Sequence, residues 1–230
     1  MPASAARRRA QEIYERLQRA YPEACCSLDF RTPIQLVVAT LLSAQSTDER
    51  VNLATPALFK KYRSVKAFAE ANQGDVEELI KQVGLYRNKA KNIVALAKLL
   101  VADYKSKVPD SIDELQKLPG IGRKSANVIK GELYGNPEGI AVDTHVSRLS
   151  FRLGLTKQKD PVRIERDLMK LFEIEQWVMI SHLLIHHGRA TCTARAPQCD
   201  QCVLLELCPQ RGVKKPQARS ASEKTSASKR

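Results

Sequence analysis

The 230-residue sequence lacks any apolar run long enough to cross a membrane, and its N-terminus lacks the apolar core of a signal peptide. It also lacks alternating runs of apolar and polar residues, the pattern of a half-buried β-strand. These absences exclude membrane-spanning, secreted and β-sheet classes. Apolar residues nevertheless make up 43% of the chain, enough for a real core, and they recur with helical spacing. We therefore expect an all-α intracellular protein with no membrane partner.

The net charge of +13 lies mainly at the two ends of the chain. Residues 1–9 contribute +3 and residues 209–230 contribute +6, which leaves +4 for the body. The segment 209–230 has no aromatic residue and one branched aliphatic residue, so burial cannot offset the entropy of ordering it. We expect a disordered basic tail, which either attracts nucleic acid in a salt-sensitive way or serves only solubility.

The stretch Leu118–Lys124, with the sequence LPGIGRK, lies between two patterns of helical periodicity, residues 111–118 and 123–133. Gly120 and Gly122 allow positive φ angles and a close approach of the backbone to a partner. The helix that follows presents free N–H groups and a positive dipole end, which suit a phosphate. A plain helix–helix turn is the alternative. The whole stretch favours phosphate binding and resembles the helix-hairpin-helix motif of DNA repair proteins.

Two side chains near this stretch could carry chemistry. Lys124 lies in the first turn of the second helix, beside Arg123, and both the neighbouring charge and the dipole favour a neutral, nucleophilic amine. A simple phosphate contact is an equally good interpretation of Lys124. Asp143 precedes another apolar helical pattern, which is typical of a helix N-cap. A carboxylate near an amine can also take its proton and stabilise positive charge on a sugar.

Four cysteines occur within 17 residues with the spacing C-x6-C-x2-C-x5-C, namely Cys192, Cys199, Cys202 and Cys208. Because intracellular thiols stay reduced, this spacing indicates a metal site with four thiolate ligands. Zinc and an iron–sulfur cluster both accept such ligands. His182 and His186 are four residues apart but lack an accompanying carboxylate motif, so we assign them to the core or a domain interface, and not to a metal.

The hairpin stretch, the segment Val142–His145 and the cysteine series, in this order and spacing, resemble the endonuclease III family of helix-hairpin-helix DNA glycosylases. The resemblance covers about residues 10–208. It implies a two-domain all-α fold with a cleft between a six-helix barrel domain, which carries the hairpin, and an iron–sulfur cluster domain. The implied division places an N-terminal helix in 1–27, packed with the cluster domain, the barrel in 28–138 and the cluster domain in 139–208.

The resemblance also implies an activity, that of a base-excision-repair DNA glycosylase with AP-lyase activity. Such an enzyme removes oxidised pyrimidines from damaged double-stranded DNA after flipping the base out of the duplex. Lys124 is then the nucleophile that forms a Schiff base, and Asp143 is the second catalytic residue. β-Elimination from the Schiff base cuts the strand. The four cysteines are implied to hold a 4Fe-4S cluster.

Gln45 and Leu85 match positions that fill the hole left by the flipped nucleotide and wedge the strands apart. The other DNA-binding positions that the resemblance implies are Leu118, Gly120, Gly122, Arg123 and His145. We expect a monomer in the bacterial cytoplasm, associated with the nucleoid. The alternatives are an adenine-mismatch-type monofunctional glycosylase of the same superfamily, and a non-enzymatic DNA-binding module in which Lys124 only contacts phosphate.

Overall fold

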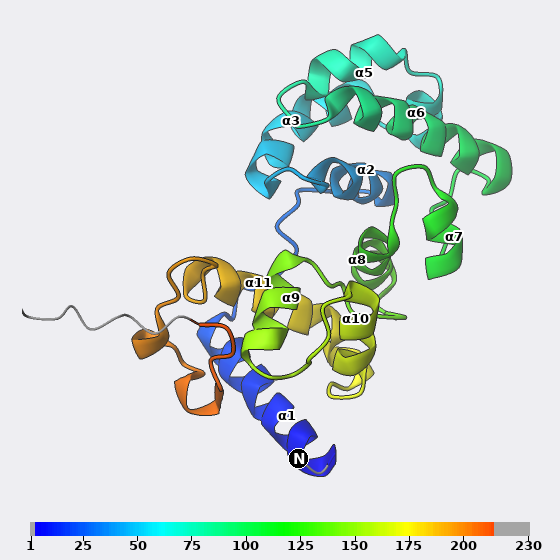
Figure 1. Cartoon of the computed structure of the whole chain (residues 1–230). Coiled ribbons are helices and arrows are strands. Elements are labelled where there is room, and N and C mark those ends of the chain that lie inside the picture. The colour runs from blue at the N-terminus through cyan, green and yellow to red at the C-terminus, as the bar shows by residue number, and fades with distance from the viewer. Residues whose placement is uncertain (1–2, 214–230) are drawn as a thin grey trace, which may run out of the picture.

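A computed structural model describes residues 3–213, and within this range every regular element is helical. No helix in that range combines the length and the apolar character that a membrane span requires. The α-helices, shown in Figure 1, are α1 (Ala3–Ala20), α2 (Pro33–Ser43), α3 (Asp48–Lys61), α4 (Val65–Ala69), α5 (Gln73–Ile80), α6 (Tyr86–Asp103), α7 (Ile112–Lys117), α8 (Arg123–Tyr134), α9 (Thr144–Arg152), α10 (Pro161–Met169) and α11 (Trp177–Ala190). Short 3-10 turns cover Ile174–Gln176, Cys199–Gln201 and Leu205–Leu207.

Side-chain caps explain where several of these helices begin. The Oγ atom of Ser111 accepts a hydrogen bond from the Glu114 N–H at 3.2 Å and opens α7, while Asp143 and Asp160 cap α9 and α10 in the same way. Gly122 opens α8 with no side-chain cap, so the first N–H groups of that helix receive no partner from the capping residue. The two helices predicted around the stretch Leu118–Lys124 are therefore present.

The first hydrophobic core is built from residues between Leu28 and Ile129, which we call the hairpin part (residues 28–138). Its centre is α2, which is buried nearly all round and packs against α3, α6 and α8. An apolar helix without a polar face needs neighbours on every side, because it has no surface suited to water. The apolar pattern of α2 thus determines the position of the helices that surround it.

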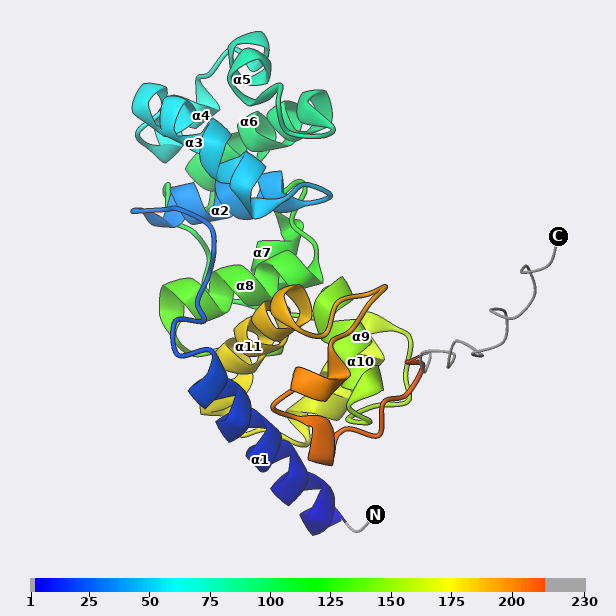
Figure 2. The same ribbon diagram turned by 90° about the vertical axis from the view of Figure 1, so that its left-hand side faces the viewer.

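A second core joins α1 to helices from the other end of the sequence, and we call residues 3–27 and 139–213 the cysteine part. Ile13 and Leu17 of α1 are fully buried against this core. The Arg9 guanidinium donates to the carbonyls of Leu153 at 2.7 Å and Leu207 at 3.0 Å. Figure 2 shows α1 running beside the C-terminal segment, so both ends of the described chain lie in one part.

The two cores lie on either side of the division predicted at residues 27/28 and 138/139, and we keep these as proposed domain boundaries. The tail needs a correction at its start, which the sequence places at residue 209. The Arg211 N–H donates to the carbonyl of Arg152 at 3.2 Å, and Val213 lines a cavity of the cysteine part. Residues 209–213 are therefore packed, and the rest of the predicted tail, 214–230, lies outside the described residues.

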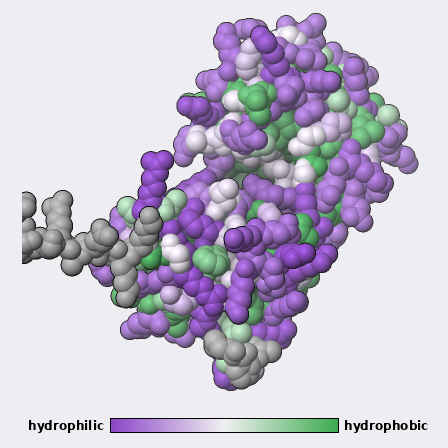
Figure 3. Space-filling view, in the orientation of Figure 1, coloured by the Kyte–Doolittle hydropathy of each residue, from purple (hydrophilic) through white to green (hydrophobic). Residues whose placement is uncertain are grey.

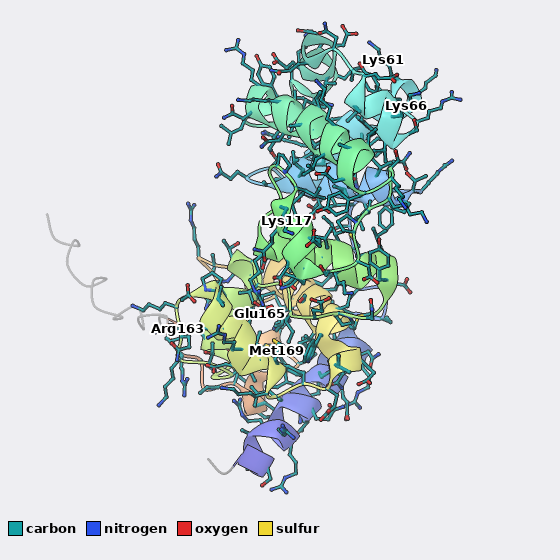
Figure 4. All side chains as sticks on the ribbon, turned by 90° about the vertical axis from the view of Figure 1, so that its right-hand side faces the viewer. Lys61, Lys66, Lys117, Arg163, Glu165 and Met169 are labelled. Carbon is teal, nitrogen blue, oxygen red and sulfur yellow. The ribbon has the colours of Figure 1, made fainter. Side chains whose placement is uncertain are left out.

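Polar contacts fasten α8 of the hairpin part to the cysteine part. Glu165 of α10, which is buried beneath α8 where the two parts meet (Figure 4), accepts hydrogen bonds from Arg123 at 2.6 Å and from Asn127 at 2.8 Å. His182 of α11 lies 2.7 Å from the carboxylate of Glu132 of α8. The interpretation of His182 as a domain-interface residue is thus confirmed. Paired polar groups at this junction favour one relative orientation of the two parts.

Candidate functional site

A deep cleft with about 2060 Å³ of empty volume, open to solvent, separates the hairpin part from the cysteine part. Figure 3 shows a largely hydrophilic surface that is hollowed between the upper and lower parts of the molecule. The cleft is lined from both sides, by the α2–α3 connection and the start of α8 on one wall, and by the start of α9 and the end of α11 on the other. A cleft with convergent polar groups between two bodies is the usual place for a substrate.

Lys124 and Asp143 line this same cleft from different elements. Lys124 is exposed in the first turn of α8, and Asp143 is half-buried at the start of α9. The Oδ1 atom of Asp143 accepts a hydrogen bond from the Val146 N–H at 2.8 Å, so the carboxylate is held in place as an N-cap. The cap interpretation of Asp143 is correct, and it leaves the second carboxylate oxygen available to the cleft.

The hairpin places its two glycines in different surroundings. Gly120 has a φ of +83°, and a Cβ atom there would lie 2.9 Å from side-chain atoms of both Asn92 and Leu41. A Cβ at Gly122 would meet nothing within 4 Å. Gly120 is therefore required by the fold, whereas Gly122 leaves open space in front of the uncapped N–H groups of α8. That space is where a phosphate can approach the backbone.

Two of the predicted DNA-binding side chains in the hairpin are engaged within the protein. Leu118 is only 1% exposed and belongs to the first core, so only its backbone can face a partner. The Arg123 guanidinium forms a two-pronged ion pair with Glu165, with donor–acceptor distances of 2.6 and 3.2 Å. The assignment of Leu118 and Arg123 to DNA binding stays a prediction, in which Leu118 acts through its backbone and Arg123 through the exposed part of its side chain. Local sequence patterns do not predict this ion pair, because Glu165 lies 42 positions from Arg123.

Gln45 and Leu85 are both exposed and both adopt left-handed backbone conformations, with φ of +55° and +59°. Leu85 exposes 57% of its surface, an unusual degree for a large apolar residue. Positive φ in residues other than glycine is strained and is often found at functional sites. His145 lies half-buried on the opposite wall of the cleft, where burial lowers the pKa of its imidazole below the usual value.

The four late cysteines line one separate cavity, together with Arg152 and His187. Their sulfur atoms attract hydrogen-bond donors from several directions. The N–H groups of Leu204 and Gln210 lie 3.4 Å from the sulfurs of Cys202 and Cys208, and the Arg152 guanidinium lies 3.3 Å from that of Cys192. Burial raises the pKa of the Cys202 and Cys208 thiols, so thiolates here require additional positive charge nearby.

The surroundings of the four thiols suit an iron–sulfur cluster. The four thiols line one cavity from different directions along the segment 192–208. A 4Fe-4S cluster takes one thiolate per iron, so its ligands stand further apart than the ligands of one ion, and N–H donors to sulfur are a usual feature of its surroundings.

Comparison with known proteins identifies the chain's relatives. Residues 38–173 match the family model described as the HhH-GPD superfamily base excision DNA repair protein, and residues 192–208 match the iron-sulfur binding domain of endonuclease III. Endonuclease III of Synechocystis sp. is 52% identical over 88% of this chain and 93% of the relative. The chain belongs to the endonuclease III family. Endonuclease III of Bacillus subtilis is 47% identical over 82% of this chain and 86% of the relative.

Solved structures of endonuclease III share the fold. A non-covalent endonuclease III–DNA complex matches with a TM-score of 0.84 and 42% identity, covering 89% of this chain and 95% of that one. A trapped endonuclease III–DNA covalent intermediate matches with a TM-score of 0.82 and 43% identity, covering 87% and 96%. The predicted all-α fold, the enzyme class of a base-excision DNA glycosylase and lyase, and the iron–sulfur cofactor are confirmed by membership of this family.

Three polar groups in the cleft were not predicted from the sequence. Arg189 of α11 donates to Asp48 of α3 at 2.7 Å, although the two residues are 141 positions apart. The Oγ1 atom of Thr40 is buried on the wall formed by α2 and has no hydrogen-bond partner among the described residues. Helical periodicity places Thr40 on an apolar helix, but it cannot show that folding leaves the Thr40 hydroxyl without a hydrogen-bond partner.

Proposed function

We propose that Lys124 and Asp143 are the catalytic residues of an endonuclease III-type DNA glycosylase and AP lyase that acts on oxidised pyrimidines in duplex DNA. The observation that carries this proposal is that an amine and a carboxylate from opposite parts of the molecule line one cleft. Neither group is used to fasten the two parts together, since Glu165 and His182 do that. Both are therefore available to a substrate.

The chemistry follows from the two groups. The neutral amine of Lys124 attacks the anomeric carbon of the lesion nucleotide, and the bond from that carbon to the base breaks, so that the base leaves with the electron pair and takes up a proton. The carboxylate of Asp143 accepts a proton from the Lys124 ammonium beforehand and stabilises positive charge on the sugar. Displacement of the base leaves a protonated amine on the anomeric carbon. After this amine loses a proton, the bond between the anomeric carbon and the ring oxygen breaks, the ring oxygen takes up a proton, and a protonated Schiff base remains. The neighbouring sugar carbon then loses a proton, its C–H electrons form a C=C bond, and the 3′ phosphate leaves with the electrons of its C–O bond, which cuts the strand.

The surrounding residues support binding of a flipped nucleotide. The free N–H groups behind Gly122 hold a backbone phosphate, while Gln45 and Leu85 enter the duplex where the base has left. His145 contacts the DNA from the opposite wall. We further propose that the protein acts as a monomer in the bacterial cytoplasm, at the nucleoid.

The 4Fe-4S cluster, when bound by Cys192, Cys199, Cys202 and Cys208, supplies structural cross-linking of the C-terminal segment. The residues of this chain that act around it are Arg152 and His187, which reach sulfur atoms of Cys192 and Cys202. Arg152 also binds the carbonyls of Thr193 and Ala194, at 2.7 and 2.9 Å. The loop between Cys192 and Cys199 is thus held by Arg152, independently of the catalytic cleft.

Trapping with borohydride tests the catalytic assignment. The reagent reduces a Schiff base, so the protein should become covalently attached to a duplex that contains an oxidised pyrimidine. Lys124→Gln should abolish trapping and strand cutting while it retains duplex binding, because the hairpin backbone is unchanged. Release of the base without strand cutting by the unmodified protein would indicate a monofunctional glycosylase. Equal loss of binding and trapping in the variant would favour a DNA-binding module.

A further inference from the structure

Gln45 and Leu85 come from separate elements but lie side by side. Gln45 and Ser46 lie in the α2–α3 connection, and Gly84 and Leu85 lie in the α5–α6 connection. A Cβ atom on Gly84 would be 3.6 Å from the carbonyl oxygen of Gln45 and 3.6 Å from the Ser46 hydroxyl, so the two connections lie close together. Each carries its exposed residue at positive φ. Two strained residues that must enter a duplex together require a common support, because strain persists only where the surroundings hold it.

Lys89 makes contact with both connections. It belongs to the first turns of α6, and its backbone N–H donates to the carbonyl of Leu85 at 3.1 Å. Its side chain crosses to the end of α2, where Nζ donates to the carbonyl of Leu42 at 2.8 Å and to the Ser46 hydroxyl at 2.9 Å. One residue is therefore bonded to Leu85 through its main chain and to the neighbour of Gln45 through its ammonium group.

This lysine is placed at a cost in free energy. Lys89 is only 5% exposed, and burial alone lowers the pKa of its ammonium group to about 8. Lys130, which is 3% exposed, is by contrast paired with the carboxylates of Asp110 and Glu138. The partners of Lys89 are instead neutral oxygens, one of them a carbonyl at the negative end of the α2 dipole. A buried charge without a carboxylate partner contributes little to stability, which directs attention to the groups that it holds in place.

We propose that Lys89 is a positioning residue, which joins the connections of Gln45 and Leu85 into a single rigid wedge. The proposal rests on the proposed function, in which these two residues enter the duplex. Lys89 itself touches neither the DNA nor the reacting atoms. It fixes the distance between the two side chains, so that together they fill the hole left by the flipped nucleotide and wedge the strands apart.

Two abasic duplexes separate this role from general support of the fold. One carries a base opposite the abasic site, and the other has a one-nucleotide gap there, so its arms still bind the protein but the strands need not be wedged apart. Lys89→Met should slow single-turnover cutting of the paired duplex about tenfold, or roughly 1.4 kcal/mol, and leave the gapped duplex unaffected within about twofold. The same variant should lose the fluorescence increase of 2-aminopurine placed opposite an uncleavable abasic analogue.

Lys130→Met is the matched control, because it removes an equally buried lysine whose partners, Asp110 and Glu138, lie in other connections. It should lower thermal stability without distinguishing the two duplexes. Ser46→Ala removes one acceptor of Lys89 and leaves the ammonium buried. It should show the same difference between the two duplexes as Lys89→Met, on a smaller scale, and it tests the proposal even if Lys89→Met folds poorly. Equal slowing on both duplexes, or the same pattern in Lys130→Met, would overturn the proposal. Failure of the proposed function is distinct, since the unmodified protein would then cut neither duplex.

Discussion

Asp48 and Arg189 form an ion pair across the cleft, with Nη2 of Arg189 lying 2.7 Å from Oδ2 of Asp48. The pair joins the start of α3 in the hairpin part to the end of α11 in the cysteine part. Ser27, on the segment that connects the two parts, donates to the same carboxylate oxygen at 2.8 Å. This three-residue contact lies beside Lys124, whose charge also acts on Asp48. It therefore holds the end of α11, on the wall of the cleft opposite the proposed nucleophile Lys124.

The stability of the protein should depend on this pair in a pH-dependent way. Burial opposes ionisation of Asp48, but hydrogen bonds from Arg189 and Ser27 outweigh it and lower the pKa of the carboxyl below 3.8. A depressed pKa gives stability that is fully present above the pKa of the unfolded chain and is lost as pH falls through the folded value. Asp48→Asn should therefore lower the melting temperature at pH 7, and the difference from the unmodified protein should shrink below about pH 4.

The control for this prediction is Asp75→Asn. Asp75 pairs with Lys61 at 2.7 Å, but both side chains are about half exposed, so removal of its charge should change stability very little at any pH. Thermal unfolding of the three proteins between pH 7 and pH 3 measures the effect. A deficit of Asp48→Asn that stays constant down to pH 3 would contradict the assignment.

The two hairpin glycines should respond differently to the same substitution. Gly120→Ala introduces a Cβ at φ +83° and 2.9 Å from Asn92 and Leu41, so it should destabilise the protein by about 1–3 kcal/mol. Gly122→Ala meets open space and should cost less than about 1 kcal/mol, yet it should weaken binding to an abasic-analogue duplex, because the methyl group stands where the phosphate approaches. Thermal unfolding and duplex titration measure both effects. Unchanged DNA affinity in Gly122→Ala would exclude the phosphate site.

Asp143 has a structural role and a proposed chemical role that can be separated by two substitutions. Asp143→Asn keeps the cap on the Val146 N–H and should leave stability nearly unchanged, while the rate of base release falls to a small fraction of the original rate. Asp143→Ala should lose about 1 kcal/mol of stability as well. Asp160→Ala removes the corresponding cap from α10, away from the cleft, and should show only the stability loss. Base release that survives in Asp143→Asn would restrict Asp143 to capping.

Replacement of Cys199 should remove the iron–sulfur cluster and the order of the C-terminal segment together. The purified protein should be brown, with broad visible absorbance and bound iron and sulfide, and Cys199→Ser should lose these signals and become sensitive to proteolysis within residues 190–213. Cys25→Ser, at an exposed thiol, is the control and should retain the colour. A folded, colourless protein that binds one zinc ion would refute the cluster assignment.

Features that depend on short stretches of sequence could be predicted. The glycine pair of the hairpin, the cap at Asp143 and the cysteine spacing each combine a few neighbouring residues, and their structures follow from local backbone and ligand chemistry. The apolar helix α2 could likewise be placed at the centre of a core, because its composition leaves no face for water.

Features that depend on partners from distant positions could not be predicted. The ion pair of Arg123 with Glu165 joins residues 42 positions apart, and Leu118 is buried in a core whose other members come from distant helices. The role of Lys89 could not be predicted for the same reason, because nothing in its own helix indicates that its ammonium group reaches the carbonyl of Leu42. The first residues of the predicted tail pack for a similar reason, since Arg211 finds the carbonyl of Arg152 only after folding.

The pairing of α1 with the end of the chain affects the order in which the protein folds during its synthesis. Arg9 and Leu207, which are bonded in the structure, are 198 positions apart, so the ribosome adds residues for about 10–40 s between them at roughly 5–20 residues per second. Until α9–α11 are made, the apolar stripe of α1 that carries Ile13 and Leu17 lacks most of the core against which it packs. The hairpin part can complete its own core meanwhile. The newly made chain therefore carries a helix with an exposed apolar face until α11 emerges, and Arg9 finds its Leu207 partner only after that.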